Sequence, residues 1–404
     1  MRTKIFGPWA DFPQRIQQLL WGQLCMNASH FMTVPLLAVF LSRDLLLGPA
    51  ALAMVMGANL LLAQSLPLLA GPLVDRYGAK PALVLGLCLR GIGLAGFASQ
   101  SDTPLLVLSA CLCGAGVAVY ESALFGVLGR EPQERLSAVF AANNQMLNLG
   151  VIVGPILGAV GSTFSVRACF AVSAALFGLL SLRAWRQPAM DGVHTSPLVQ
   201  ASGGWRSMRT ALTHRPFQLL VCAAMPWYFL FPQLYVAFPI YLKNLSESGS
   251  TAAIYVVNGI VGVGFMVLAR QWLVHTPPRQ LLLVAYAAAS LLFASVALTD
   301  SLLWFYLFLV GYTVVETTIL PAIETLTSTV APDGSQGTFF GVLSMAGALT
   351  GTAGYYVGSW LVVDGARATA WLVFGAVGVL GVVLTAALWT QVKPAPLNRP
   401  SAAL

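Results

Sequence analysis

A short charged turn, Gly71-Pro-Leu-Val-Asp75-Arg76-Tyr-Gly78-Ala-Lys80-Pro81, separates two almost wholly apolar segments, residues 49–73 and 81–100. Each segment has about the 20 mainly apolar residues that a helix needs to cross a bilayer. The same alternation of long apolar runs and short polar turns continues along the chain in both directions. The pattern predicts an all-α integral membrane protein.

Breaking the chain at its polar and Pro/Gly clusters gives twelve membrane-spanning segments. Their predicted bounds are 16–42, 49–73, 81–100, 103–128, 137–161, 165–184, 214–242, 251–272, 279–298, 301–328, 337–362 and 368–391. The first segment follows basic residues, as a secretion signal does, but it is too long for the apolar part of a signal peptide and lacks a clear cleavage site. We therefore interpret it as the first membrane helix.

The composition excludes a soluble fold. Only 9% of the 404 residues are charged, against about 25% in soluble globular proteins, while 57% are hydrophobic. Collagen-like, disordered and disulfide-scaffold classes are excluded as well. The cysteines all lie in apolar stretches and are interpreted as small buried side chains, so we expect no disulfide, no metal and no cofactor. They are Cys25, Cys88, Cys111, Cys113, Cys169 and Cys222.

Basic residues are strongly biased toward one side of the predicted membrane. Sixteen fall on the side that holds both termini and four on the other, and Arg90 lies inside a helix. The sixteen are Arg2, Lys4, Arg15, Arg76, Lys80, Arg130, Arg135, Arg183, Arg186, Arg206, Arg209, Arg215, Arg270, Arg279, Lys393 and Arg399, and the four are Arg43, Arg167, Lys243 and Arg367. Because positive loops stay in the cytoplasm, both termini are predicted to be cytoplasmic. The net charge of +7 is then explained by the orientation of the chain in the membrane, and no nucleic-acid partner is expected.

The chain divides into two similar halves. A long polar stretch from Arg183 to His214 separates six segments from six, which predicts an N-terminal half (1–184), a cytoplasmic linker (185–213) and a C-terminal half (214–404). Two patterns recur at nearly one offset, as parallel repeats require. Gly116-Val-Ala-Val-Tyr-Glu121 matches Gly311-Tyr-Thr-Val-Val-Glu316 after 195 residues, and Gly150, Gly154 and Gly158 match Gly347, Gly351 and Gly354 or Gly358 after about 197. We expect two pseudo-symmetric six-helix bundles.

The charged turn resembles the cytoplasmic loop motif of the major facilitator superfamily, G-x-x-x-D-R-x-G-x-K, at all five defining positions. Gly78 permits a tight turn, and Pro81 suits the first position of the next helix. The resemblance implies that Gly71, Asp75, Arg76, Gly78 and Lys80 form a conformational latch between the halves, with a plain topology-setting turn as the alternative. The corresponding loop, residues 270–279, lacks the acidic residue and the glycine, so the second latch is expected to be degenerate.

The fifth segment carries Gly150, Gly154, Pro155 and Gly158, which resemble the helix motif of the superfamily's drug:proton antiporter branch, with Ala159 in place of its last glycine. Glycines at these intervals also form a plain packing face, and the proline bends a helix. The resemblance favours an exporter over an importer. The branch's usual membrane-embedded arginine would align near Ala110, and this sequence has none there.

A few ionisable residues fall inside the predicted helices, where a charge costs roughly 2.5–3.5 kcal/mol on insertion scales and is a functional candidate. Glu121 and Glu316 are the leading proton carriers or cation-binding groups, because proton-coupled transport requires a buried carboxyl that is protonated in a cycle. The alternative is a structural pair with Arg90 or with polar neighbours. His30 is a further candidate, or a neutral histidine hydrogen-bonded to Asn27 or a neighbouring helix.

The stretch from Glu316 to Glu324 resembles the acidic tenth helix of the multidrug and siderophore exporter subgroup that includes the MdtH-type proteins. Glu324 lies close enough to the cytoplasmic end to be merely interfacial. In this superfamily helices 1, 4, 7 and 10 line the cavity, so aromatic and amide side chains are cavity candidates, with aromatic belts and helix–helix hydrogen bonds as the alternatives. These candidates are Asn27, Trp227, Tyr228, Phe231, Gln233, Tyr235, Asn143, Asn144 and Asn258.

These features predict a monomeric secondary active transporter in a bacterial inner membrane, working by alternating access. We expect proton-driven export of a small organic molecule such as a drug or a siderophore. A proton symporter or importer of a small metabolite with the same fold is the alternative. An enzyme or receptor would need a nucleophile–base pair, a metal cluster or a soluble domain, and an ATP-driven pump would need a P-loop; the sequence has none of these.

Overall fold

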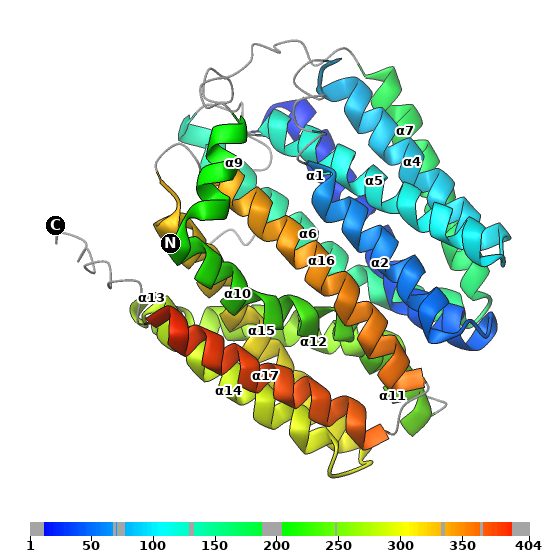
Figure 1. Cartoon of the computed structure of the whole chain (residues 1–404). Coiled ribbons are helices and arrows are strands. Elements are labelled where there is room, and N and C mark those ends of the chain that lie inside the picture. The colour runs from blue at the N-terminus through cyan, green and yellow to red at the C-terminus, as the bar shows by residue number, and fades with distance from the viewer. Residues whose placement is uncertain are drawn as a thin grey trace, which may run out of the picture.

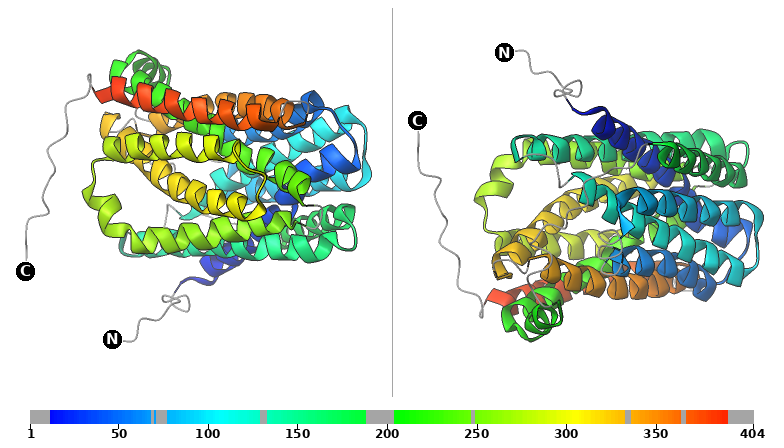
Figure 2. Two further views of the ribbon diagram at one scale, coloured as in Figure 1. Left: turned by 90° about the horizontal axis from the view of Figure 1, so that it is seen from below. Right: turned by 90° about the horizontal axis from the view of Figure 1, so that it is seen from above.

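The computed structural model describes residues 12–67, 70, 77–128, 133–187, 204–246, 249–332, 336–363 and 367–389. Within these ranges all regular elements are helices, and Figures 1 and 2 show that the long helices run roughly along a common axis. Ten of the described helical segments are long and apolar enough to cross a membrane. The shorter α2 and the 28-residue α16 supply the other two crossings. The all-α, twelve-helix fold expected from the sequence is confirmed.

The helices of the first half follow the predicted segments closely. They are α1 (Gln14–Val39) with its π-helical extension η2 (Phe40–Asp44), α2 (Pro49–Ser65), α4 (Ala79–Ser99), α5 (Thr103–Leu128), α6 (Gln133–Ser162) and α7 (Val166–Arg186). The helix α4 begins at Ala79, so Pro81 lies in its first turn and not at its first position as expected. A proline is still tolerated there, because the first N–H groups of a helix have no partner within it. Gly78, just before α4, has a φ of 92°, a backbone conformation that favours glycine.

The second half repeats this arrangement after α9 (Gly204–Thr213), a short helix within the predicted linker. Its elements are α10 (Arg215–Leu230), the 3₁₀ turn η3 (Phe231–Leu234), α11 (Ala237–Leu245), α12 (Thr251–Leu268), α13 (Arg270–His275), α14 (Pro278–Val296), α15 (Leu302–Val330), α16 (Gln336–Val363) and α17 (Arg367–Trp389). The predicted single helix 214–242 is in fact the three pieces α10, η3 and α11. Pro232 lies in the 3₁₀ turn, where the missing N–H of proline interrupts the helical ladder.

Glycine faces bring the corresponding helices of each half into backbone contact. A Cβ on Gly154 of α6 would lie 2.5 Å from the carbonyl oxygen of Ala28 in α1. A Cβ on Gly354 of α16 would lie 2.5 Å from the carbonyl oxygen of Phe229 in α10. Both contacts are closer than any real Cβ allows, so only glycine fits. The packing role that the sequence left open for these glycines is therefore present in both halves.

The two halves meet along α2 and α16, which lie side by side in Figure 1, and along α6 and α12. Hydrogen bonds between described residues cross this boundary. Thr352 Oγ1 donates to Gly57 O (3.4 Å), Ser359 Oγ to Pro49 O (3.1 Å), and Arg43 Nη2 to Asn244 Oδ1 (2.8 Å). The last two lie where α2 begins and α16 ends, so the halves are joined at the end of the molecule opposite the end of α2 and the start of α4.

Candidate functional site

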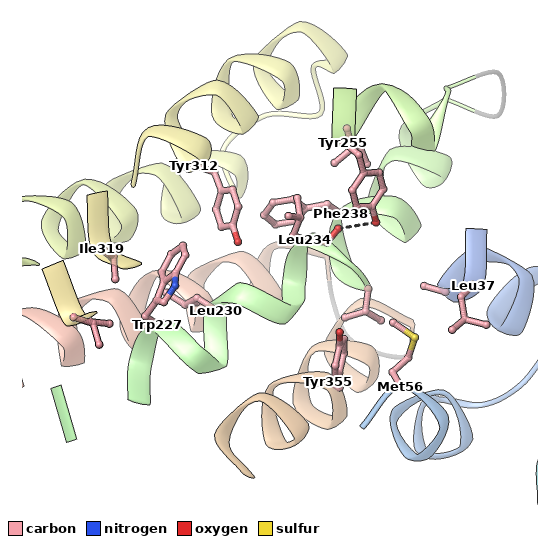
Figure 3. Close-up of a cluster of buried hydrophobic side chains, with 14 of the residues drawn as sticks. Leu37, Met56, Trp227, Leu230, Leu234, Phe238, Tyr255, Tyr312, Ile319 and Tyr355 are labelled. Atoms are coloured by element: carbon pink, nitrogen blue, oxygen red, sulfur yellow. Dashed lines mark hydrogen bonds between the residues drawn. The ribbon is translucent and has the colours of Figure 1, made fainter. Parts of the chain in front are cut away.

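A cavity of about 370 Å³ lies between the two halves. Its wall comes mainly from α1 and α2, with two residues of α5, single residues of α4, α6 and α16, and three residues at the break between α10 and α11. Figure 3 shows Leu37, Met56 and Tyr355 from α1, α2 and α16, three residues of the wall. The wall consists of Met26, Asn27, His30, Phe31, Val34, Leu37, Met56, Asn59, Leu60, Ala63, Gln64, Pro67, Arg90, Val117, Glu121, Leu147, Phe231, Pro232, Tyr235 and Tyr355.

Arg90 of α4 is the cationic side chain of this wall. Its side chain is 5% exposed, and its guanidinium carbon lies 5.2 Å from the centre of the Phe177 ring. One terminal nitrogen donates a hydrogen bond to His30 Nδ1, while the buried Nε has no partner among the described residues. A buried charged group normally has all its donors paired. Arg90 therefore lines the cavity and carries one buried donor, Nε, that has no partner among the described residues.

The contact with Arg90 defines the state of His30. A guanidinium group can only donate hydrogen bonds, so His30 Nδ1 must accept and cannot carry a proton. Of the alternatives open from the sequence, the structure shows a histidine bonded to a neighbouring helix, because Asn27 Nδ2 donates instead to Gln23 O at 2.9 Å.

Glu121 reaches the same cavity from α5. The approach of α5 to α4 depends on Gly116, because a Cβ there would lie 2.6 Å from Gly86 O and 2.8 Å from Arg90 N. Glu121 lies five residues further along α5, is partly exposed to the cavity, and has no hydrogen-bond partner in the described part of the chain. A carboxyl group in this setting is accessible from the cavity and makes no hydrogen bond with the described residues.

Glu316, the counterpart of Glu121 in the internal repeat, has different surroundings. Its Oε2 accepts a hydrogen bond of 2.6 Å from Asn258 Nδ2, which also donates to Thr313 Oγ1 at 3.1 Å. These three side chains join α12 to α15, and none of them is part of the cavity wall. Glu316 and Asn258 therefore form a hydrogen-bonded pair between helices, the alternative that the sequence left open.

Several other predicted residues lie away from the cavity. Trp227 is fully buried, and its ring stacks on Tyr312 with 5.7 Å between centres, inside the second half (Figure 3). Gln233 is fully buried and donates to Phe229 O (3.0 Å) and Gly354 O (2.9 Å). These two residues, with Asn143, Tyr228 and Asn258, are not among the residues that line this cavity. A residue type suited to a cavity does not show which face of its helix it occupies.

The remaining predicted positions lie outside this cavity or outside the described residues. Glu324 is exposed near the end of α15. This position fits the alternative that Glu324 lies at the membrane interface. The side chain of Asn144 and the latch residues Gly71, Asp75 and Arg76 are outside the described part of the chain, while Lys80 lies in the first turn of α4. Asn27, His30, Arg90, Glu121, Phe231 and Tyr235 are the sequence candidates that the structure brings together.

The structure adds cavity residues that the sequence reasoning missed. Asn59 and Gln64 in α2 and Tyr355 in α16 line the wall. The two amides could have been found, because polar side chains inside an apolar segment usually face a protein interior or a cavity. Tyr355 carries no such signal, since tyrosine is also common at lipid-facing interfaces.

The chain resembles known transporters in sequence. It is 26% identical to the multidrug resistance protein MdtH of Klebsiella pneumoniae, over 93% of this chain and 94% of that protein. It is 25% identical to a Na(+), Li(+), K(+)/H(+) antiporter of Planococcus maritimus, over 90% of this chain and 92% of the relative. An uncharacterised MFS-type transporter of Mycobacterium tuberculosis is 27% identical over 64% of this chain, a match that spans only 62% of that relative.

Solved structures share the fold at low identity. A peptide transporter, POT, superposes with a TM-score of 0.77 at 17% identity, over 94% of each chain. The nucleoside transporter NupG superposes with a TM-score of 0.74 at 16% identity, over 94% of this chain and 100% of that one. The family model of the Major Facilitator Superfamily matches residues 19–355, most of the twelve-helix fold and the whole cavity wall. The chain is therefore a transporter that belongs to the Major Facilitator Superfamily.

Proposed function

We propose that this transporter is a proton-coupled exporter of a small organic molecule, such as a drug or a siderophore, in a bacterial inner membrane. The observation that carries the proposal is the carboxyl group of Glu121, which reaches the cavity between the halves without a hydrogen-bond partner among the described residues. A carboxylate in this position can bind either a proton or a cationic group of a substrate. Competition of the two for one carboxylate couples their movement in opposite directions.

The arrangement of the halves supports an alternating-access cycle. The two halves, which we take as residues 1–184 and 214–404, are joined by Arg43–Asn244 and Ser359–Pro49 at the end that the basic residues predict to be outside. This is the arrangement expected when the cavity faces the cytoplasm. In the proposed cycle, Glu121 releases its proton to the cytoplasm, binds substrate, and takes up a proton again after the halves have rocked outward.

Relatives support exchange with protons. One relative is named a multidrug resistance protein and another a Na(+), Li(+), K(+)/H(+) antiporter. The glycine and proline motif of α6, which resembles that of drug:proton antiporters, is consistent with this direction. The antiporter's name also makes monovalent cations candidates for the exchanged ion.

Arg90 supports the alternative, a proton symporter that imports a small metabolite. Its guanidinium group, which lines the cavity, could bind an anionic group of a substrate, and that binding would be favoured when Glu121 is protonated and neutral. Substrate and proton would then bind together, which is the requirement for symport. The two functions therefore differ in the sign of the coupling between substrate and proton at Glu121.

Everted membrane vesicles energised by respiration test the export proposal. The probes are ethidium, sodium ions and a hydroxamate siderophore, each added to vesicles that hold a proton gradient reported by a fluorescent dye. An exporter dissipates the gradient when its substrate is added, and Glu121→Gln abolishes the response because an amide cannot carry the proton. Asp102→Asn, which neutralises an exposed carboxyl outside the cavity, is the matched control and should respond as the wild type does.

The sign of coupling separates the two functions. Substrate added to the purified protein in weakly buffered detergent solution should release protons from an antiporter and take them up in a symporter. Proton uptake that disappears in Glu121→Gln would establish the alternative. An unchanged gradient response in Glu121→Gln would remove Glu121 from either mechanism.

A further inference from the structure

A second polar cavity lies on the outer side of the first half, where the first turns of α1 meet the last turns of α7. Its volume is about 540 Å³, and its wall includes Gln14 and Gln18 of α1 and Leu179, Arg183 and Arg186 of α7. The helices α1 and α7 are in contact. Gln187, just after α7, joins the two helices here, because its Nε2 donates a hydrogen bond to Gln18 Oε1 at 2.8 Å. We propose that this groove binds the phosphodiester headgroup of an anionic phospholipid.

The two arginines are available to bind an anion. Arg183 and Arg186 are exposed, and neither makes a hydrogen bond or an ion pair with the described residues. They are three residues apart on α7, so their side chains lie on the same face of the helix. Two neighbouring guanidinium groups with free donors match the oxygens of a phosphate group.

The surface below the arginines is suited to an acyl chain. Leu179 lies one turn deeper than Arg183 on the same face of α7 and is 65% exposed. Going along α7 from the bilayer centre, this face therefore changes from apolar to cationic, in the same order as an acyl chain and its headgroup. A free phosphate ion would use only the cationic part, so the continuous apolar stripe favours a lipid.

Two tryptophans mark the depth of the groove in the membrane. Trp21 of α1 is 52% exposed and Trp185 of α7 is 67% exposed. Trp21 lies near the start of α1 and Trp185 near the end of α7, the two helix ends that form the groove. Exposed tryptophans are enriched at the level of the lipid headgroups. The arginines thus lie at headgroup level, on the side that the basic residues predict to be cytoplasmic, where basic pockets between membrane helices bind anionic headgroups.

Native mass spectrometry of the full chain, released from detergent, tests the proposal. The probes are phosphatidylglycerol and phosphatidylcholine with identical acyl chains, titrated onto the wild type and onto Arg183→Gln/Arg186→Gln. We expect the double variant to bind phosphatidylglycerol roughly 25-fold more weakly, from about 5-fold per arginine. Binding of phosphatidylcholine, which is zwitterionic and has no net charge, should change much less between the two proteins.

A matched double variant, Arg209→Gln/Arg215→Gln, removes two exposed arginines, one in the linker helix α9 and one at the start of α10, and controls for net charge. It should bind phosphatidylglycerol as the wild type does. Equal losses in both double variants, or equal affinity of the wild type for the two lipids, would overturn the site. Displacement of phosphatidylglycerol by millimolar inorganic phosphate would show a soluble-anion site and would overturn the lipid proposal. Arg186→Gln alone, with an expected loss of about 5-fold, serves if the double variant does not fold.

Discussion

Glu121 in the first half and Glu316 in the second occupy equivalent positions of the repeat, 195 residues apart, yet their surroundings differ. Glu121 faces the cavity with Arg90 in the same wall. Glu316 is bound by Asn258, outside that wall. The position equivalent to Arg90 in the second half is Ala285, which is buried in α14. The repeat has kept the acidic residue and has changed what surrounds it.

The supporting framework is similar in both halves. Glycines of α6 contact the backbone of α1, and glycines of α16 contact the backbone of α10 and the turn that follows it. Helix positions are thus set in the same way twice, while the polar side chains between the helices differ. Equivalence in an internal repeat therefore predicts backbone position and does not predict the role of a side chain.

The largest expected effect, on the rate of transport, comes from replacing each of the two glutamates by glutamine in separate variants. Glu121→Gln should reduce proton-coupled transport to the level of vesicles without the protein, because no proton can be carried at the cavity. Glu316→Gln should keep much of the activity, because an amide oxygen still accepts the hydrogen bond from Asn258. Both are measured as initial rates in the same vesicle preparation, normalised to the amount of protein. The reverse order of activities would transfer the coupling role to the second half.

The glycine contacts should be equally sensitive in both halves. Gly154→Val and Gly354→Val each force a side chain into a backbone contact, and overpacking of this kind costs about 1–3 kcal/mol or more. We expect lower thermal stability and less monodisperse protein for both. Gly178→Val is the control, because a Cβ there meets nothing within 4 Å. A loss in one half only would show that the two frameworks are not equivalent.

Asn258→Ala tests the hydrogen-bonded pair of the second half. It removes the donor to Glu316 and should cost roughly 1.5–3 kcal/mol, the range for a hydrogen bond to a charged group. Glu316→Gln in the same background should then be nearly neutral, since the bond is already lost. Thermal unfolding of the two single variants and the double variant in detergent measures this coupling. Additive losses would mean that the pair contributes no joint stabilisation.

The smallest effect is expected at the contact that joins the two halves. Arg43→Gln weakens an exposed hydrogen bond to Asn244 and should cost about 0.5–1.5 kcal/mol. Because this bond exists only while the halves are closed at that end, its loss should shift the protein toward the opposite opening. A cysteine-labelling reagent applied from each side of the membrane to residue 27, as Asn27→Cys in a cysteine-free background, reports the shift. Unchanged labelling from both sides would show that the bond does not influence the equilibrium.

Much of the fold could be predicted because every helix that crosses the bilayer needs about 20 mainly apolar residues. Predicted and observed bounds agree closely for segments such as 103–128 and Thr103–Leu128. The break between α10 and α11 was missed, although Pro226, Pro232 and Pro239 all lie in that segment. Pro226 lies inside the regular helix α10, while Pro232 lies in the 3₁₀ turn. A proline weakens a helix, but the neighbouring helices decide whether it is kept.

The candidate site was harder to predict than the fold. His30, Arg90 and Glu121 were selected because a charge or a titratable group inside a membrane helix needs a reason, and all three lie on the cavity wall. Trp227 and Gln233 were selected by residue type and by their place in the seventh predicted helix, and they lie in the interior of the second half. Aromatic and amide side chains suit a cavity, a helix contact and a membrane interface equally well, so their type carries little information.

The sequence by itself determined that this protein is a membrane protein with twelve helices in two related halves, and it identified the family. These properties follow from the scarcity of charge, the length of the apolar runs and a repeat of nearly constant offset, all of which are local or periodic. Only the tertiary structure decided which of two equivalent glutamates faces the cavity. That choice depends on how α4, α5 and α12 are rotated against their neighbours, and side chains from distant parts of the chain set those rotations by packing.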